Sequence, residues 1–155
     1  MIEKSREMKK NLRFIFVLLI MVIIFLFSNQ NADVSTGVSD SFIKGIFNIF
    51  NLNLSITDII TVIVRKSAHF SIYLLLGISV INYIIIYDKK DKNMIIISIL
   101  ICLLYSISDE FHQYFVPGRS MELRDIIIDT MGASVGVFTY LSLYKRVLID
   151  NNKSL

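Results

Sequence analysis

Residues 94–119 read MIIISILICLLYSISDEFHQYFVPGR, and they pass from an apolar run into a cluster of ionisable groups. The part Met94–Ile107 has almost no charged or strongly polar atoms, whereas the part that follows holds Asp109, Glu110, His112 and Arg119. Ionisable side chains at the end of such a run are costly to place in lipid, and they are rare there unless something uses them. We therefore expect a membrane span that ends in a functional site.

The composition of the whole chain supports a membrane protein. At 155 residues the chain is one domain at most, 54% of it is hydrophobic, and its mean hydropathy is +0.63. A soluble domain of this size cannot bury so much apolar surface. The net charge is only +3 and no basic stripe with interleaved aromatics occurs, so we expect membrane lipids rather than nucleic acid as partners. The lone Cys102 lies in an apolar run and excludes an intrachain disulfide.

Four apolar segments come close to the roughly 20 residues that a spanning helix needs. We expect spans at about residues 12–30, 67–87, 94–115 and 126–144, and hence an all-α integral membrane four-helix bundle. The membrane domain is then 14–144, with a polar N-terminus at 1–13 and a tail at 145–155 that frays from residue 147. A cleaved signal peptide is the alternative for the first span, but a small-x-small cleavage site is lacking after it, which favours a retained helix.

The segment between the first two spans is expected to hold a loop and a short helix. Residues 28–41 are polar and predict a loop, whereas apolar residues between Phe42 and Phe50 recur with helical spacing. This helix is too short to span, so we expect an amphipathic helix on the extracytoplasmic membrane surface. Ser55–Asp58 can then cap the next helical segment.

Lys and Arg are distributed unequally between the alternate ends of the spans. Eleven of the 16 lie in the N-terminal segment, the 88–93 turn and the C-terminal tail, whereas five lie in the other two connections (Lys44, Arg65, Lys66, Arg119 and Arg124). Because cytoplasmic segments carry an excess of Lys and Arg, both termini are predicted to be cytoplasmic. The polar clusters then all lie at the extracytoplasmic ends of their spans.

Spacing within the polar clusters predicts that they meet. Residues three or four apart share a helix face. Such spacings occur among Arg65, Lys66, His69 and Tyr73, among Asp109, Glu110, His112 and Gln113, and between Asp125 and Asp129. Gly132 and Gly136 continue the face of Asp129, and small residues at this spacing let helices approach closely in lipid.

The depth of Asp109 requires a compensating partner. Asp109 lies 15 residues after Met94, or about 22 Å along a helix, within a hydrocarbon core of about 30 Å. An unpaired carboxylate there costs on the order of 2–3 kcal/mol, which pairing with Arg65, Lys66, Arg119 or Arg124 offsets.

Each of these residues also has a simpler interpretation. Arg65 and Lys66 can be anchors that reach to the membrane surface, and His69 can be a hydrogen-bonded packing residue. Asp125 can be a charge favoured by a helix N-terminus, and Tyr73 an interface aromatic.

Three segments also carry a family resemblance. They are RKSAHFSIYLLLG (Arg65–Gly77), DEFHQYFVPGRS (Asp109–Ser120) and RDIIIDTMGASVG (Arg124–Gly136), with FSNQNADVS (Phe27–Ser35) as a weaker fourth. In order, spacing and residue type they resemble the signature segments of VanZ-like membrane proteins, over about residues 14–140. The resemblance implies a small multi-pass protein of the bacterial cytoplasmic membrane. The founding member of that family is associated with low-level resistance to the glycopeptide teicoplanin.

The resemblance also implies which polar positions matter. The matching residues are Lys66, His69, Tyr73, Asp109, Glu110, His112, Gln113, Arg119, Asp125 and Asp129. Two positions depart from the family pattern: Ile72 stands where many members have Glu, and Asp129 stands where many have Asn.

Two functions fit these residues. In the first, the protein binds an anionic or lipid-linked envelope component, such as a phospholipid or polyprenyl-linked precursor. Arg65, Lys66 and Arg119 then hold its phosphate or carboxylate. The site also includes Gln113, Asp125, Asp129 and Tyr73.

In the second, the protein is a membrane-embedded hydrolase or transferase acting on such a lipid. His69 and His112 are then the general acid and base, and Arg119 stabilises developing charge. Asp109, Glu110 and Asp125 orient the imidazoles or bind a divalent metal. A transporter is a third possibility, which the lack of an inverted repeat disfavours.

The predicted topology is testable by labelling. In a Cys102→Ser background, single cysteines in place of Gln30 and Ser120 should react with a membrane-impermeant maleimide added outside intact cells. Reaction of both only after permeabilisation would mean that the topology is reversed.

Overall fold

The structure is a computed structural model, and it describes residues 2–49, 58–87 and 93–153. Its five helices are α1 (Ile2–Ser28), α2 (Ala32–Ile49), α3 (Asp58–Ile84), α4 (Asn93–Gln113) and α5 (Leu123–Lys153). All except α2 are long and apolar enough to cross a membrane, and the described residues contain no strand. The expectation of an all-α membrane bundle with four spans is confirmed.

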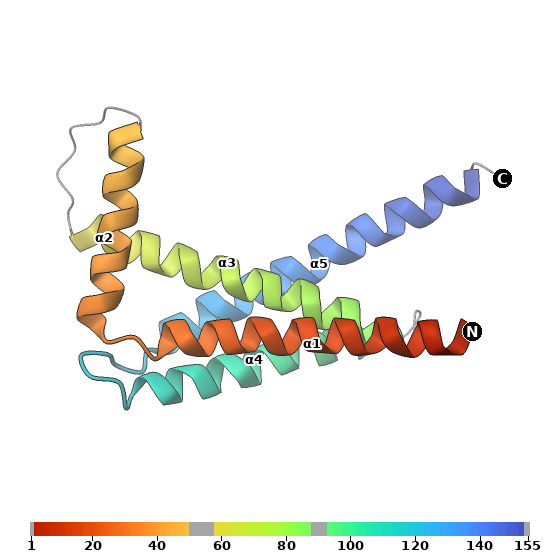
Figure 1. Ribbon diagram of the computed structural model, residues 1–155, viewed down its shortest axis with the longest axis horizontal. Coiled ribbons are helices and arrows are strands. Elements are labelled where there is room, and N and C mark those ends of the chain that lie inside the picture. The colour runs from red at the N-terminus through yellow and green to blue at the C-terminus, as the bar shows by residue number, and fades with distance from the viewer. Residues whose placement is uncertain (1, 50–57, 88–92, 154–155) are drawn as a thin grey trace.

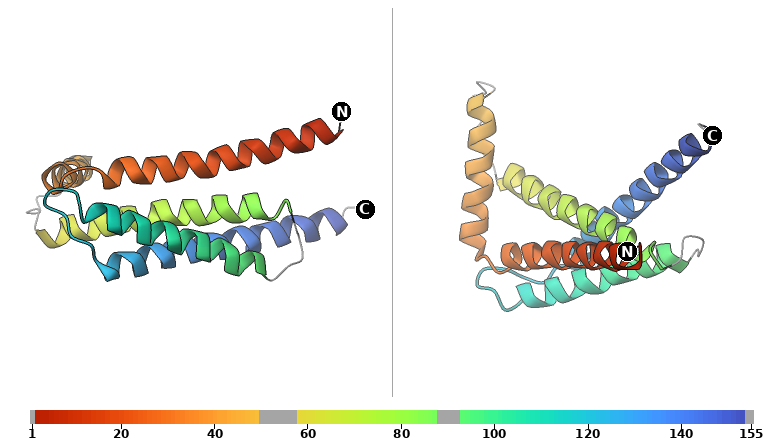
Figure 2. Two further views of the ribbon diagram at one scale, coloured as in Figure 1. Left: turned by 90° about the horizontal axis from the view of Figure 1, so that it is seen from below. Right: turned by 45° about the vertical axis from the view of Figure 1, so that its right-hand side comes forward.

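The four long helices pack against one another, and α2 crosses one end of them. Figure 1 shows α2 nearly at right angles to α1, at the end of the molecule away from both chain ends. Figure 2 shows that the N- and C-termini lie toward the same end, as an even number of spans requires. A hydrogen bond from Thr61 Oγ1 of α3 to Asp40 Oδ1 of α2, at 2.7 Å, ties α2 to the bundle.

Several element boundaries differ from the sequence-based expectation. The predicted loop at 28–41 is wrong, because α2 begins at Ala32 and includes most of it. The second span was expected from residue 67, but α3 begins at Asp58, so Arg65, Lys66 and His69 lie inside the helix. These polar side chains find partners within the bundle and therefore need not mark a helix end. The tail expected to fray remains helical to Lys153.

Two sequence-based expectations fall outside the described residues. They are the capping segment up to Thr57 and most of the charged turn at 88–93. The location of α2 on a membrane surface also stays a prediction.

The bundle exposes large apolar side chains and buries several polar and ionisable ones. Large apolar side chains are exposed along every long helix, among them Phe16, Leu19, Ile63, Ile96, Leu104, Ile127 and Phe138. Buried polar side chains include Thr61, Ser98, Ser106, Asp109, Glu110, Gln113 and Asp129. A soluble protein shows the opposite distribution, whereas a bundle in lipid keeps its ionisable groups facing the interior.

The backbones of α3 and α5 approach closely where glycines replace side chains. A Cβ placed on Gly136 would lie 2.1 Å from the Leu74 carbonyl oxygen, and one on Gly132 would lie 2.4 Å from that of Phe70. Gly77 of α3 makes the reciprocal contact, since its Cβ would lie 2.1 Å from the Ala133 carbonyl oxygen. This interface has the small-residue packing expected for helices in lipid.

Polar contacts join α1 and α4 to the bundle and also link α3 to α5. Arg13 Nη1 of α1 donates to the Asn82 carbonyl oxygen at 2.7 Å, and Tyr140 of α5 donates to Asn82 Oδ1 at 2.8 Å. Tyr105 of α4 donates to the Met21 carbonyl oxygen at 2.5 Å. Together with the apolar core around Tyr73, Leu76 and Cys102, these bonds set the rotation of each helix. That rotation decides which side chains enter the polar interior.

Substitution of Gly136 should destabilise the bundle through α3. Gly136→Ala forces the two backbones apart, at a cost of about 1–3 kcal/mol for overpacking. The loss should show as a lower melting temperature in detergent and as earlier reaction of the buried Cys102 thiol. Gly45→Ala is the matched control, because a Cβ there meets nothing within 4 Å. Equal melting temperatures for the two variants would contradict the proposed close packing.

Candidate functional site

The three polar clusters meet inside the bundle. α3 contributes Lys66 and His69, α4 contributes Asp109 and Glu110, and α5 contributes Asp129. Asp129 and Glu110 have no exposed surface, and Asp109 is 4% exposed. Buried carboxylates need partners from within the protein, so loss of one of their contacts would destabilise the fold.

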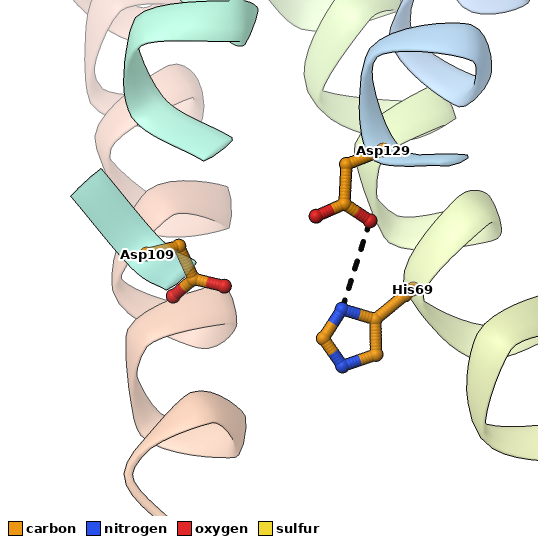
Figure 3. Close-up of side chains that lie close together, drawn as sticks. All are labelled: His69, Asp109 and Asp129. Atoms are coloured by element: carbon orange, nitrogen blue, oxygen red, sulfur yellow. Dashed lines mark ion pairs between the residues drawn. The ribbon is translucent and has the colours of Figure 1, made fainter. Parts of the chain in front are cut away.

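His69, Asp109 and Asp129 form the centre of this cluster. His69 Nδ1 lies 3.7 Å from Asp129 Oδ1, as Figure 3 shows. The other oxygen of this carboxylate, Oδ2, accepts a hydrogen bond of 3.1 Å from the Ser106 hydroxyl of α4. One ligand atom from each of the three residues lies within 4.8 Å of the others. Three helices thus converge on one point.

Asp109 forms no ion pair with a lysine or arginine of the described residues. Its Oδ2 accepts a hydrogen bond of 3.2 Å from the Gln113 amide, whose oxygen accepts one of 3.0 Å from Arg119 Nη1. The expected pairing of Asp109 with a cation is therefore indirect, since Gln113 lies between the carboxylate and the guanidinium. These two hydrogen bonds link the interior of the bundle to the segment between α4 and α5.

Glu110 contacts the backbone at the start of α5. Its Oε2 accepts a hydrogen bond of 2.9 Å from the backbone N–H of Glu122, which immediately precedes α5. The N–H groups at a helix start lack partners within the helix, and a carboxylate that accepts from them also suits the helix dipole. Glu110 thereby fixes the start of α5 against the end of α4.

Lys66 is paired with two acidic residues of the last polar segment. Its ammonium forms an ion pair and hydrogen bond with Asp125 Oδ1, and a second pair with Glu122 Oε2 at 3.4 Å. Glu122 was not predicted as a site residue, because it lies in the segment before α5, where the sequence shows no helical periodicity. Its position two residues before the polar Arg124-Asp125 pair is the only signal that the sequence offered.

Arg65 and Arg119 lie near each other without an acidic partner. The ion pairs among the described residues use Lys10, Lys66 and His69, and neither arginine takes part in one. Burial, and then the neighbouring Arg65 guanidinium, lower the pKa of Arg119, against the opposite effect of nearby carboxylates such as Asp109. The Arg119 Nε atom is buried and has no hydrogen-bond partner among the described residues. Two adjacent guanidiniums that lack an acidic partner favour the binding of an anion.

Two cavities adjoin at these arginines. One, of about 180 Å³, has mainly apolar walls from α1, α2 and α3, including Ile24, Phe27, Val38 and Ile72. The other, of about 160 Å³, is lined by Gln113, Gly118, Arg119, Ser120, Glu122 and Asp125 together with α3 residues. Arg65, His69 and Arg119 line both. The site therefore has an apolar part and a polar part with cationic side chains between them.

His112 lies apart from the central cluster. Its Nε2 is 3.3 Å from Asn29 Oδ1, and its ring packs against Phe25 of α1 with centroids 4.8 Å apart. Tyr73 is fully buried, with its ring 6.4 Å from that of Tyr105. The contacts of the His112 ring are thus with Asn29 and Phe25 rather than with His69 or Asp129.

The exposed apolar surface, the four long helices and the buried polar interior define a multi-pass membrane protein. The VanZ/LLP1 family matches residues 13–145, and the chain belongs to this family. No match was found among curated proteins or among solved structures.

One departure from the family pattern is offset in the structure. The resemblance described above implies a carboxylate one turn from His69, where this chain has Ile72. Asp129 supplies a carboxylate beside His69 instead, at 3.7 Å from Nδ1. The His69 imidazole therefore has a carboxylate beside it although residue 72 is isoleucine.

The Lys66–Asp125 pair should be coupled energetically. Both side chains are 20% exposed, so removal of either leaves a poorly solvated charge. Lys66→Met and Asp125→Asn should each lower the melting temperature in detergent, and the double variant should be less destabilised than the sum of both. The expected coupling is about 1–3 kcal/mol. Strict additivity would contradict a direct interaction.

Proposed function

We propose that this protein binds an anionic, lipid-linked component of the bacterial envelope at the extracytoplasmic side of the cytoplasmic membrane. The observation that carries the proposal is the pair of adjoining cavities with Arg65 and Arg119 at their junction. An amphiphile has the same sequence of parts, namely an apolar chain, a phosphate and a polar headgroup. By holding such a molecule the protein alters how glycopeptides such as teicoplanin reach their target.

The apolar cavity suits the chain of the lipid. Its walls come from α1, α2 and α3, and α2 contributes Ser35, Val38 and Ser39. α2 thus covers this cavity at one end of the bundle. A helix at this place, lying across the spans at the membrane surface, positions the chain between protein and bilayer.

The arginines suit the phosphate. A guanidinium binds phosphate oxygens through two parallel hydrogen bonds, which an ammonium cannot do. Lys66 is already paired with Asp125 and Glu122, so Arg65 and Arg119 are the cations left for a ligand. Gln113 orients Arg119 and the polar cavity beyond it has room for a small headgroup.

The charge distribution supports the extracytoplasmic side of the membrane. The basic residues of the N-terminal segment and the tail favour the cytoplasm. The site lies at the opposite end of the bundle, near the α1–α2 and α4–α5 connections.

A membrane-embedded enzyme is the second candidate, and the His69–Asp129 pair favours it. A carboxylate beside an imidazole is the arrangement that orients a general base. The imidazole lines both cavities, within the region assigned to the lipid. His112 is less suited to act with it, because its ring contacts Asn29 and Phe25.

The binding proposal is tested with purified protein in detergent. A fluorescent polyprenyl phosphate and a short-chain phosphatidic acid should bind, whereas a diacylglycerol of equal chain length should bind weakly. Arg119→Gln and Arg65→Gln should each weaken binding by about ten- to a hundredfold, the value of a lost charge-assisted hydrogen bond. Arg124→Gln is the matched control, because Arg124 is exposed and lines neither cavity.

Equal binding by Arg119→Gln and Arg124→Gln would contradict the proposal. The same samples distinguish the two candidates. Mass spectrometry of the bound lipid should recover it unchanged if the protein only binds. Release of a product by the wild type, abolished by His69→Gln, would establish the enzyme instead.

A further inference from the structure

His69, Asp109 and Asp129 have the residue types and spacing of a metal site. Each comes from a different helix, and one ligand atom of each lies within 4.8 Å of the others. Figure 3 shows the carboxylate of Asp109 directed across a common space toward the imidazole and the carboxylate of Asp129. Ligand atoms on one ion are about 3–3.5 Å apart for metal–ligand distances near 2.1 Å. The longest separation, up to 4.8 Å, would therefore shorten by roughly 1.3–1.8 Å on binding.

Buried polar atoms in this cluster lack hydrogen-bond partners. Asp129 Oδ1 and His69 Nδ1 face each other at 3.7 Å, but neither has a hydrogen bond among the described residues, although Asp129 has no exposed surface. The Tyr73 hydroxyl is also buried, and it has no hydrogen-bond partner among the described residues. Buried polar groups are satisfied in the great majority of cases, so several at one point indicate a ligand.

The hydrogen bonds that do exist leave the facing atoms available. Ser106 donates to Oδ2 of Asp129, and Gln113 donates to Oδ2 of Asp109. Each carboxylate is thereby oriented through Oδ2, and Oδ1 of Asp129 has no hydrogen bond among the described residues. Residues that orient metal-binding carboxylates and imidazoles in this way contribute strongly to metal affinity.

The charge of the cluster also calls for a cation. Two carboxylates face a single imidazole, and Glu110 adds a third buried carboxylate nearby. Lys66 is paired with Asp125 and Glu122, and Arg119 reaches Asp109 only through Gln113. A negative excess in an interior of low dielectric is unfavourable unless a cation or protons balance it.

We propose that His69 Nδ1, Asp109 and Asp129 bind one divalent transition-metal ion, Zn²⁺ or Mn²⁺. Mixed imidazole and carboxylate ligands suit these ions better than Mg²⁺ or Ca²⁺, which prefer oxygen alone. The ion is a different ligand from the lipid proposed above, and its binding does not depend on that function. Metal ligands must be deprotonated, so binding of the ion releases the protons that these residues hold.

The experiment uses full-length protein in detergent, freed of metal with a chelator and then titrated with ZnCl₂ or MnCl₂. The wild type should bind one equivalent per chain, and its melting temperature should rise with metal concentration. His69→Gln, Asp109→Asn and Asp129→Asn should each lose at least about tenfold in affinity. No binding by the wild type, or unchanged binding by His69→Gln, would overturn the proposal.

His112→Gln is the matched control, because it removes the other of the two histidines and leaves the cluster intact. It should bind metal as the wild type does. This variant also identifies the ligand without disturbing the site. With Cu²⁺ as the probe, pulsed electron paramagnetic resonance on ¹⁵N-histidine-labelled His112→Gln should show coupling to one imidazole nitrogen, which only His69 can supply. Absence of that coupling would overturn the assignment even if the cluster variants fail to fold.

Discussion

The close contact between α3 and α5 is the interaction on which the site depends. Gly132 lies against the backbone of Phe70, the residue after His69, and it is three residues from Asp129. Because these backbones touch, the imidazole and the carboxylate on the same faces are held together. A side chain at Gly132 or Gly136 would separate the helices and with them the two halves of the cluster.

Charge in the site is arranged in two layers. The inner layer, Asp109, Glu110 and Asp129, is acidic and almost fully buried, whereas Arg65 and Arg119 lie at the junction of the cavities. Gln113 connects the layers, because it donates to Asp109 and accepts from Arg119. An inner anionic layer favours a cation and an outer guanidinium pair favours an anion. The two proposed ligands therefore correspond to the two layers.

Much of this site could be predicted from residue spacing, and the failures have physical causes. The spacing of Asp109 and His112 suggested a common face, but residues three apart differ by about 60° around a helix axis. That difference is enough for Asp109 to face α5 while His112 packs against Phe25 of α1. Glu122 lies in a connection, where periodicity gives no information. A helical segment was expected after Ser55–Asp58, and α3 begins at Asp58, but the span was expected only from residue 67 because Arg65 and Lys66 resembled a membrane boundary.

The sequence by itself determined the number of spanning helices and which segments are polar. Transfer of a side chain into lipid depends on its own chemistry, so hydropathy and spacing reveal this much without knowledge of neighbours. Only the tertiary structure decided which partner each ionisable group has: Asp129 for His69, Gln113 for Asp109, and Asp125 for Lys66. These choices depend on the rotation and crossing of whole helices. Packing sets both, through glycine contacts and buried side chains that lie far apart in the chain.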